Sequence, residues 1–299
     1  MKSRPYVLPT LIFGFILLFC ASAYGGQVIT ESVRQWAEQA VAQEAALTTQ
    51  LTPNSIAILY YNNSTGTAKF DALQKGLAIM LITDFSKLDR FQVVERIKIQ
   101  ALIDEENLNV SGLSEQKHSE RLGILLGAAY VSGGDIGAGT TTDLAVSPQM
   151  VNVPQTAISN QPMVSGNLND LNKVEKAILW DMIEFMDIEL TEEEREKLEK
   201  PIAADIDVLM EFFNGVHASD MGNYALAAKH YQQSIALAPG FVLAVEALAE
   251  LEKEKLWVQT GQTSPKSNIV PGMIGVATGA GIIWIIEEAQ RDSASPYRP

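Results

Sequence analysis

Hydrophobic residues along this chain fall into short continuous runs and into longer stretches with helical spacing. The run 55–61, SIAILYY, is apolar at nearly every position, which is typical of a strand buried on both faces. Further strands are expected at 91–94 and 130–132, and helical spacing predicts helices over 30–47, 71–88, 95–106, 119–126 and 168–186. Strands that alternate with helices at this interval predict a layered α/β domain.

The composition of the chain changes between residues 143 and 166, where Val, Thr, Pro, Gln and Asn dominate and two or three short strands are expected. Further on, Thr191 and Glu194 have the spacing of a capping box. We therefore interpret the acidic run 192–199 as the solvated start of a helix, where carboxylates suit the helix dipole, and not as a metal site. The α/β domain is predicted to span residues 51–200.

Helical spacing continues through most of residues 203–257, which we predict to be a helical repeat. The intervals between small and aromatic residues are those of a tetratricopeptide repeat, a helix-turn-helix unit of about 34 residues. The residues at these intervals, which we assign to a protein-binding groove, are Gly215, Gly222, Tyr224, Ala227, Tyr231, Pro239 and Phe241.

In this interpretation Gly215 is the small residue where two helices touch, Ala227 packs against the first helix, and Tyr231 fills the groove. An unrelated helical hairpin is the alternative. One such unit cannot bury its own faces, so it must pack on the α/β domain or on a partner.

The first residues have the pattern of an export signal. Lys2 and Arg4 precede an apolar run over 11–19, and Ala21-Ser22-Ala23 is a site for signal peptidase. Residues 1–23 are therefore predicted to be a cleaved signal peptide, which implies a periplasmic protein. Lipidation of Cys20 is the alternative, which the bulky residue before it disfavours. An amphipathic helix is expected next, within residues 28–50.

The end of the chain carries a charge-free stretch, 269–286, that contains Gly275 and Gly279 at the spacing that lets membrane helices approach closely. We predict an apolar, glycine-rich helix over 269–289. Two roles stay open for it: membrane association or self-association on one side, and packing against the rest of the chain on the other.

The chain is acidic, with 22 Lys+Arg against 36 Asp+Glu and a formal net charge of −14. This balance argues against a nucleic-acid partner, because affinity for phosphate backbones needs clustered Lys and Arg. A hydrophobic share of 47% is enough for a packed core. The only cysteine, Cys20, lies in the predicted signal peptide, so neither a disulfide nor a cysteine nucleophile is expected in the exported protein.

Motifs that carry chemistry are absent from the sequence, which has no G-x-S-x-G, H-E-x-x-H or Walker A pattern. The histidines, His118, His217 and His230, are scattered and have no carboxylates at metal-ligand spacing. The glycine run 133–139 is followed by a strand pattern, whereas a dinucleotide site needs a helix there, so a strand bend is expected. We therefore predict a protein that is not an enzyme and has no catalytic residue, cofactor or metal.

Four segments of the α/β part resemble the curli-secretion channel (CsgG-like) family: 56–66, 73–87, 91–105 and 126–137. The junction Val93-Val94-Glu95-Arg96, followed by a helix, is the most specific of them. The resemblance implies a three-layer α+β or α/β fold of the TolB N-terminal-like, anticodon-binding-like kind. Together with the repeat, the chain is similar to periplasmic CsgG/HfaB-type proteins that end in helices.

In the resembled family two long amphipathic hairpins assemble into a membrane channel. The corresponding region here, 140–167, is short and carries Pro148, Pro154 and Pro162, although prolines are confined to sheet edges and bulges. The sequence therefore favours an accessory or scaffold in protein secretion or surface-structure assembly, which binds envelope proteins, with self-association left open. The alternatives are an oligomeric outer-membrane channel and a periplasmic activator of a cell-wall synthase.

Overall fold

The computed structural model describes residues 27–44, 51–106, 116–137, 143–258, 273–278 and 281–286. Residues 23–264 form one compact unit, and the last two segments belong to another, which is treated separately below. The predicted signal peptide, residues 1–23, lies outside the described residues. So does the end of the predicted N-terminal helix, because residues 45–50 are not described.

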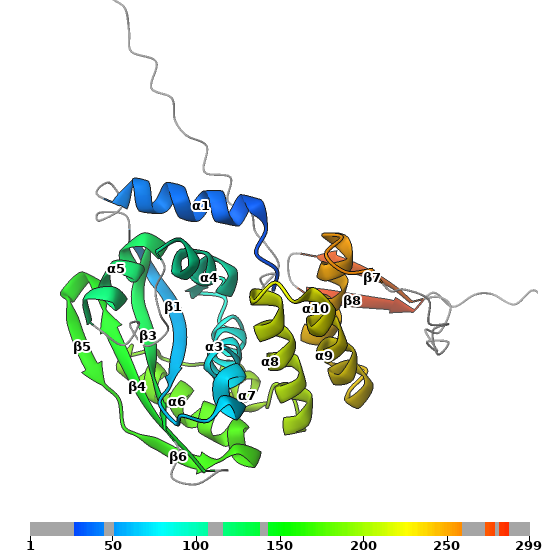
Figure 1. Ribbon diagram of the computed structural model, residues 1–299. Coiled ribbons are helices and arrows are strands. Elements are labelled where there is room, and N and C mark those ends of the chain that lie inside the picture. Colours follow the sequence, from blue (N-terminus) through cyan, green and yellow to red (C-terminus); the bar gives the residue numbers. More distant parts are fainter. Residues whose placement is uncertain are drawn as a thin grey trace, which may run out of the picture. The chain divides into compact units, whose positions relative to one another are not determined.

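A mixed six-stranded sheet organises the larger unit (Figure 1). Its strands are β1 Thr52–Asn63, β2 Gln92–Val93, β3 Ala128–Gly137, β4 Asp143–Asn152, β5 Ala157–Asn160 and β6 Val164–Asn167. Their order is β2-β1-β3-β4-β5, and β6 also pairs with β4. Strand β1 is parallel to β2 and β3, whereas β4 is antiparallel to β3, β5 and β6. The prediction of short strands after residue 143 is confirmed.

Helices cover both faces of the sheet. They are α1 Glu31–Ala42, α3 Asp71–Phe85, α4 Arg96–Glu105, α5 Gln116–Leu126, α6 Leu171–Phe185 and α7 Glu192–Glu199. Gly123 of α5 lies against Val131, and Met182 of α6 lies 3.7 Å from the hydroxyl of Ser132. Neighbouring residues of a strand point to opposite faces, so α5 and α6 lie on opposite sides of β3. The predicted mixture of strands and helices is confirmed.

Strand β1 runs through the centre of the hydrophobic core. Its residues 55–61 are all buried, as the continuous apolar run predicts, because β1 has strands beside it and helices on both faces. Helix α3 packs against β1 and is itself apolar on most sides, with 11 of its 15 residues buried. It lies between the sheet and helix α8, Ile206–Asp220, which follows the α/β part.

Gly134 allows the β3–β4 pair to bend where a proline interrupts it. Gly134 pairs with Pro148 and has a φ of +152°, which L side chains rarely adopt. A Cβ atom on this residue would lie 2.3 Å from the carbonyl oxygen of Ser147. Pro148 is tolerated because β4 changes partner there, from β6 on one side of it to β5 on the other. The glycine run therefore continues a strand, as expected.

Replacing Gly134 with alanine is expected to lower the free energy of unfolding by about 1–3 kcal/mol, because the added methyl group meets the partner backbone and φ is strained. Gly133→Ala is the matched control. The nearest atom to the added Cβ would be the Leu59 Cβ, at the ordinary contact distance of 3.6 Å. This control should change stability by no more than about 0.5 kcal/mol. Urea unfolding of both variants measures this, and equal losses would contradict the assigned strain.

The acidic run at 192–199 makes up the whole of helix α7, which begins with the predicted capping box. The Thr191 hydroxyl accepts a hydrogen bond from the Glu194 N–H at 3.2 Å, and the Glu194 carboxylate accepts one from the Thr191 N–H at 2.8 Å. Arg90 binds the same carboxylate. These hydrogen bonds lower the pKa of Glu194 to about 2, with the Arg90 guanidinium as the main cause.

The prediction of a C-terminal helix over 269–289 is wrong for the residues that are described there. They form two antiparallel strands, β7 Met273–Thr278 and β8 Gly281–Ile286. Isoleucine favours strands, and glycine disfavours helices. The residue types in this stretch therefore outweighed the charge-free length and the glycine spacing from which the helix was predicted. Gly275 thus lies in a strand and not at a helix contact, and Gly279 is outside the described residues. Within the described part of the chain, no helix is long and apolar enough to cross a membrane.

Candidate functional site

Helices α8, α9 Tyr224–Leu237 and α10 Val242–Lys253 follow one another and pack together. A Cβ atom on Gly215 of α8 would lie 2.4 Å from the ring of Tyr231, so α8 and α9 approach closely because residue 215 has no side chain. The Tyr231 ring stacks at an angle beside Phe212, with ring centroids 5.9 Å apart. Phe241, before α10, contacts the same Phe212 ring edge-to-face at 5.5 Å.

The residues that we assigned to a protein-binding groove are mostly internal. Gly215, Ala227 and Tyr231 are buried, and Phe241 is only 7% exposed. Buried side chains hold the helices together and offer no surface to a partner, so their assignment to partner contacts is wrong. The other three lie at helix ends: Gly222, with a φ of +73°, Tyr224 and Pro239.

The apolar side chains that α9 and α10 do expose are different ones. Leu226 and Leu237 of α9 are 40% and 53% exposed, and Val242 and Val245 of α10 are 46% and 42% exposed. The spacing of the two valines places them on one side of α10. These four residues, which we call the α9–α10 apolar surface, were not singled out from the sequence, because the pattern alone does not show which neighbour covers which face.

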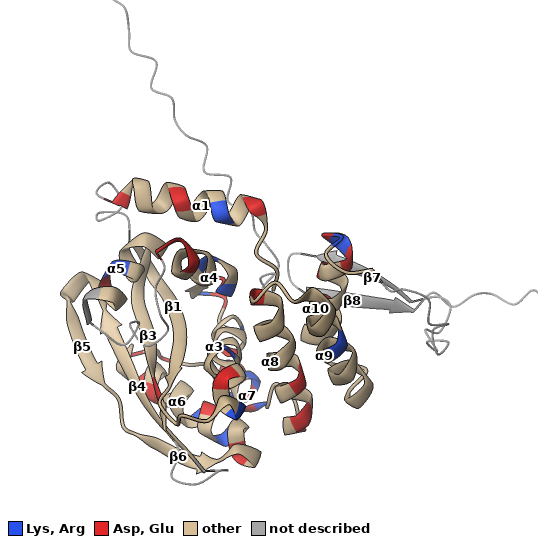
Figure 2. Cartoon of the chain, viewed as in Figure 1, with Lys and Arg blue, Asp and Glu red and all other residues tan. Residues whose placement is uncertain are grey.

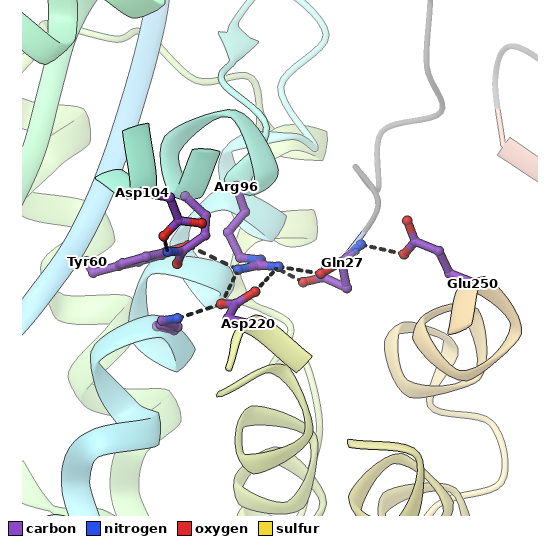
Figure 3. Close-up of polar contacts among 8 residues, drawn as sticks. Gln27, Tyr60, Arg96, Asp104, Asp220 and Glu250 are labelled. Carbon is purple, nitrogen blue, oxygen red and sulfur yellow. Dashed lines mark hydrogen bonds and ion pairs between the residues drawn. The ribbon is translucent and has the colours of Figure 1, made fainter. Parts of the chain in front are cut away.

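A buried arginine joins these helices to the sheet (Figure 3). Arg96, the first residue of α4, is 2% exposed. It donates to both carboxylate oxygens of Asp220, the last residue of α8, at 2.8 and 3.3 Å. It also donates to the Tyr60 hydroxyl on β1 at 3.0 Å. Burial, the largest single influence, lowers the pKa of Arg96, but Asp220, Tyr60 and Tyr231 together outweigh burial and raise that pKa above its ordinary value.

The Asp220 carboxylate also accepts a hydrogen bond from a second cation, the Lys75 ammonium on α3, at 2.6 Å. The side chains of Asp220 and Lys75 are 2% and 12% exposed. A carboxylate at a helix C-terminus faces the negative end of the helix dipole, which is unfavourable by itself. The two cations offset this, so α3, α4 and α8 are held together by one carboxylate. Burial lowers the pKa of Lys75, and the Asp220 charge acts against this shift.

The remaining donors of Arg96 bind the N-terminal segment. Arg96 donates to the side-chain oxygen of Gln27 at 2.9 Å and to its carbonyl oxygen at 2.6 Å. On the other side, the Gln27 N–H donates to the carboxylate of Glu250 on α10 at 2.5 Å. Val28, which follows, is 2% exposed. We call Arg96, Asp220, Lys75, Tyr60, Gln27 and Glu250 the Arg96 cluster.

The Arg96 cluster is a set of mutually satisfied charges. Each charged group in it has an opposite charge or a hydrogen bond to satisfy it, and burial raises the pKa of the Tyr60 hydroxyl. No group of three or more His, Cys, Asp or Glu side chains suited to a metal ion occurs among the described residues. The geometry is therefore suited to holding peptide segments in place. In the sequence, Arg96 stands out only as part of a family-like junction, and nothing in the pattern connects it to Asp220 or Gln27.

A second buried carboxyl lies on the other side of α3. Glu175 on α6 is 0% exposed, and the Lys176 ammonium lies 3.4 Å from one of its carboxylate oxygens. The neighbouring carboxylate, Asp84, binds Lys87 and Lys176. Burial raises the pKa of Glu175 well above its ordinary value, and the negative charge of Asp84 adds to this, whereas Lys176 acts in the opposite direction.

Glu175→Gln is expected to stabilise the protein more at pH 8 than at pH 5. A carboxyl whose folded pKa is raised lowers stability as the pH rises above its unfolded pKa of about 4.3, because the unfolded chain then loses the proton first. Glutamine has no proton to lose, so the variant lacks this dependence. Urea unfolding at both pH values measures the difference. Parallel pH curves for wild type and Glu175→Gln would contradict the assignment.

Comparison with known proteins finds a family match for one part of the chain. The family model described as curli production assembly/transport component CsgG matches residues 33–140, which confirms the family resemblance for this part of the chain. The C-terminal domain of LpoB from Salmonella enterica is 14% identical, with 44% of this chain and 98% of that chain covered and a TM-score of 0.31. The lipoprotein GNA1162 from Neisseria meningitidis is also 14% identical, with coverage of 46% and 100% and a TM-score of 0.33. No curated protein matches the chain.

Proposed function

We propose that this protein, whose residues 33–140 are a CsgG family domain, is a non-enzymatic accessory or scaffold protein of the cell envelope that acts by binding another protein. The CsgG match supports a role in secretion or in the assembly of surface structures. Export through the signal peptide at 1–23 and a periplasmic location are part of this proposal.

The observation that carries the proposal is the way the helices are attached. Asp220 fixes α8 to α3 and α4 through buried ion pairs, while the α9–α10 apolar surface stays exposed. Because buried ion pairs hold α8 to the α/β part, the exposed apolar side chains of α9 and α10 are available to a partner protein. We interpret α8 and α9 as a tetratricopeptide repeat with α10 as the first helix of a next one, because Gly215 and Tyr231 meet at the helix contact.

The surface of the larger unit does not favour nucleic acid. In the cartoon of Figure 2, the Lys and Arg positions of the described residues are scattered over several helices and are not gathered on one element. The net charge of −14 acts in the same direction. A protein partner is therefore the proposal.

Site-specific photo-crosslinking in intact cells tests the proposal. A photoreactive residue at Val245 or Leu237 is expected to crosslink one defined envelope protein. Met163, which is apolar, 65% exposed and on the connection between β5 and β6, is the matched control and should not give that product. The absence of any product from the α9–α10 apolar surface, or the same product from Met163, would contradict the proposal.

Fractionation tests the location of the protein. The full chain is expected in the periplasmic or membrane fraction, and a chain without residues 1–23 in the cytoplasm. A chain that ends at Asn268 separates the two roles left open for 269–286. If the full chain stays in alkali-washed membranes and the shortened one is released, that stretch associates with the membrane. Retention of the full chain in the cytoplasm would contradict the envelope proposal.

A further inference from the structure

The Arg96 cluster contains a short bent segment of chain, residues 27–28, whose backbone groups are bound by side chains from distant elements. The backbone of Gln27 is bound at both polar groups, its N–H by Glu250 and its carbonyl oxygen by Arg96. The amide side chain accepts from Arg96 as well, and the Val28 side chain is buried. Side chains that bind only backbone groups can bind a peptide of any sequence that has the same backbone conformation. Specificity for a particular peptide comes from the pockets that its side chains fill.

The groups that hold Gln27 lie on elements far from it in the chain. Arg96 begins α4 and Glu250 is on α10, so residues separated by 69 and 223 positions converge on one peptide unit (Figure 3). Burial raises the pKa of the Glu250 carboxyl, whereas the N–H groups of Gln27 and Val28 lower it. Without an occupant, Arg96 would keep two buried donors unpaired and Glu250 would lose its backbone partners, which is costly. The site therefore favours being filled.

We propose that the site between α4, α8 and α10 is a peptide-binding site that residues 27–28 of the chain itself occupy, and that a segment of the partner protein with the same backbone conformation binds there by displacing them. The segment would carry a side-chain oxygen acceptor followed by a branched apolar residue, as Gln27 and Val28 do. This inference rests on the proposed function, since it names the part of the partner that is recognised. It makes the N-terminal segment a competitor that keeps the site closed until a partner arrives.

The test uses the exported chain, which starts at Tyr24, and a fluorescent peptide with the sequence of residues 24–30, YGGQVIT. Gln27→Pro removes from the chain both the N–H that Glu250 binds and the side-chain amide, and leaves Arg96, Asp220 and Glu250 in place. The variant is expected to bind the peptide about tenfold or more tightly than the wild type. In the wild type, residues 27–28 occupy the site most of the time, and the apparent affinity falls in proportion to the fraction of molecules in which the site is open.

Two controls make the result specific. The same peptide with proline in place of glutamine should not bind, and Glu250→Ala added to Gln27→Pro should abolish the gain without touching the Arg96–Asp220 pair. Equal affinity of the wild type and Gln27→Pro, or no binding to either, would overturn the inference.

A second measurement does not depend on the fold of a variant. In wild-type protein, the amides of Gln27 and Val28 are expected to exchange with solvent by local opening, faster than those of α4 and β1. Exchange that occurs only with global unfolding would make the segment a fixed part of the core and would overturn the inference. If crosslinking at Val245 succeeds and peptide binding fails, only this inference is lost. If the peptide binds and no crosslink forms, the proposed partner surface is lost.

Discussion

Asp220→Asn is expected to lower the free energy of unfolding by about 3–5 kcal/mol, because it removes one partner of a buried ion pair and leaves the others charged. Arg96 and Lys75 both donate to this carboxylate, and both side chains are almost fully buried. The amide that replaces the carboxylate carries no charge, so Arg96 and Lys75 would lose the one carboxylate to which both donate. Urea unfolding of the full chain at pH 7 measures the loss.

The pH dependence of this variant identifies the cause. The pKa of Lys75 is already lowered by burial, and loss of the anion lowers it further. A depressed folded pKa of a lysine means that stability rises as the pH approaches its unfolded pKa of about 10.4. The gap between wild type and Asp220→Asn is therefore expected to narrow between pH 7 and pH 10. A gap that stays constant would show that the loss comes from altered packing and not from unpaired charge.

Asp170→Asn is the matched control for Asp220→Asn. Asp170 also pairs with a lysine, at 2.7 Å, but this pair is at the surface, with side chains that are 46% and 83% exposed. Exposed pairs are screened by water and salt and contribute little. The control is expected to unfold at the same urea concentration as the wild type. Equal losses in both variants would contradict the claim that burial makes Asp220 special.

Gly215→Val is expected to separate α8 from α9 and to lower the free energy of unfolding by about 3 kcal/mol or more. Its Cβ atom alone would lie 2.4 Å from the Tyr231 ring, and Tyr231 is fully buried beside Phe212 and cannot move away. Overpacking of this kind typically costs 1–3 kcal/mol, and a branched side chain on a helix contact is at the upper end. Hydrogen exchange is expected to speed up in α8, α9 and α10 while the β1 amides stay protected.

Gly240→Ala is the control for this substitution, because no atom lies within 4 Å of its Cβ position. It should change stability by no more than about 0.5 kcal/mol. The Gly215→Val variant should also lose the crosslink at Val245, since the α9–α10 apolar surface would no longer be held in place. Retention of the crosslink in a variant whose α8 amides exchange freely would contradict the link between this helix contact and partner binding.

Features that depend on near neighbours in the chain were predictable. Residues 55–61 indicated a strand buried on both faces because an apolar run of that length has few other uses, and β1 has that burial. Thr191 and Glu194 indicated a helix start because the capping box lies within four residues. The intervals from Gly215 to Tyr231 indicated a close helix contact because helical spacing places small and large residues on facing sides.

Features that depend on which distant segments meet were decided by the tertiary structure. The sequence by itself determined the alternation of strands and helices, the family resemblance and the excess of acidic residues. It did not show that Arg96 would be buried against Asp220, 124 residues away, or that Gln27 would lie between Arg96 and Glu250. These groups lose their water only when distant segments pack together. A buried charge is costly unless it is paired, so its partner depends on which segments the fold brings next to it. Four of the residues named for the partner groove, Gly215, Ala227, Tyr231 and Phe241, proved to be buried for the same reason, because exposure is a property of the folded chain and not of the spacing.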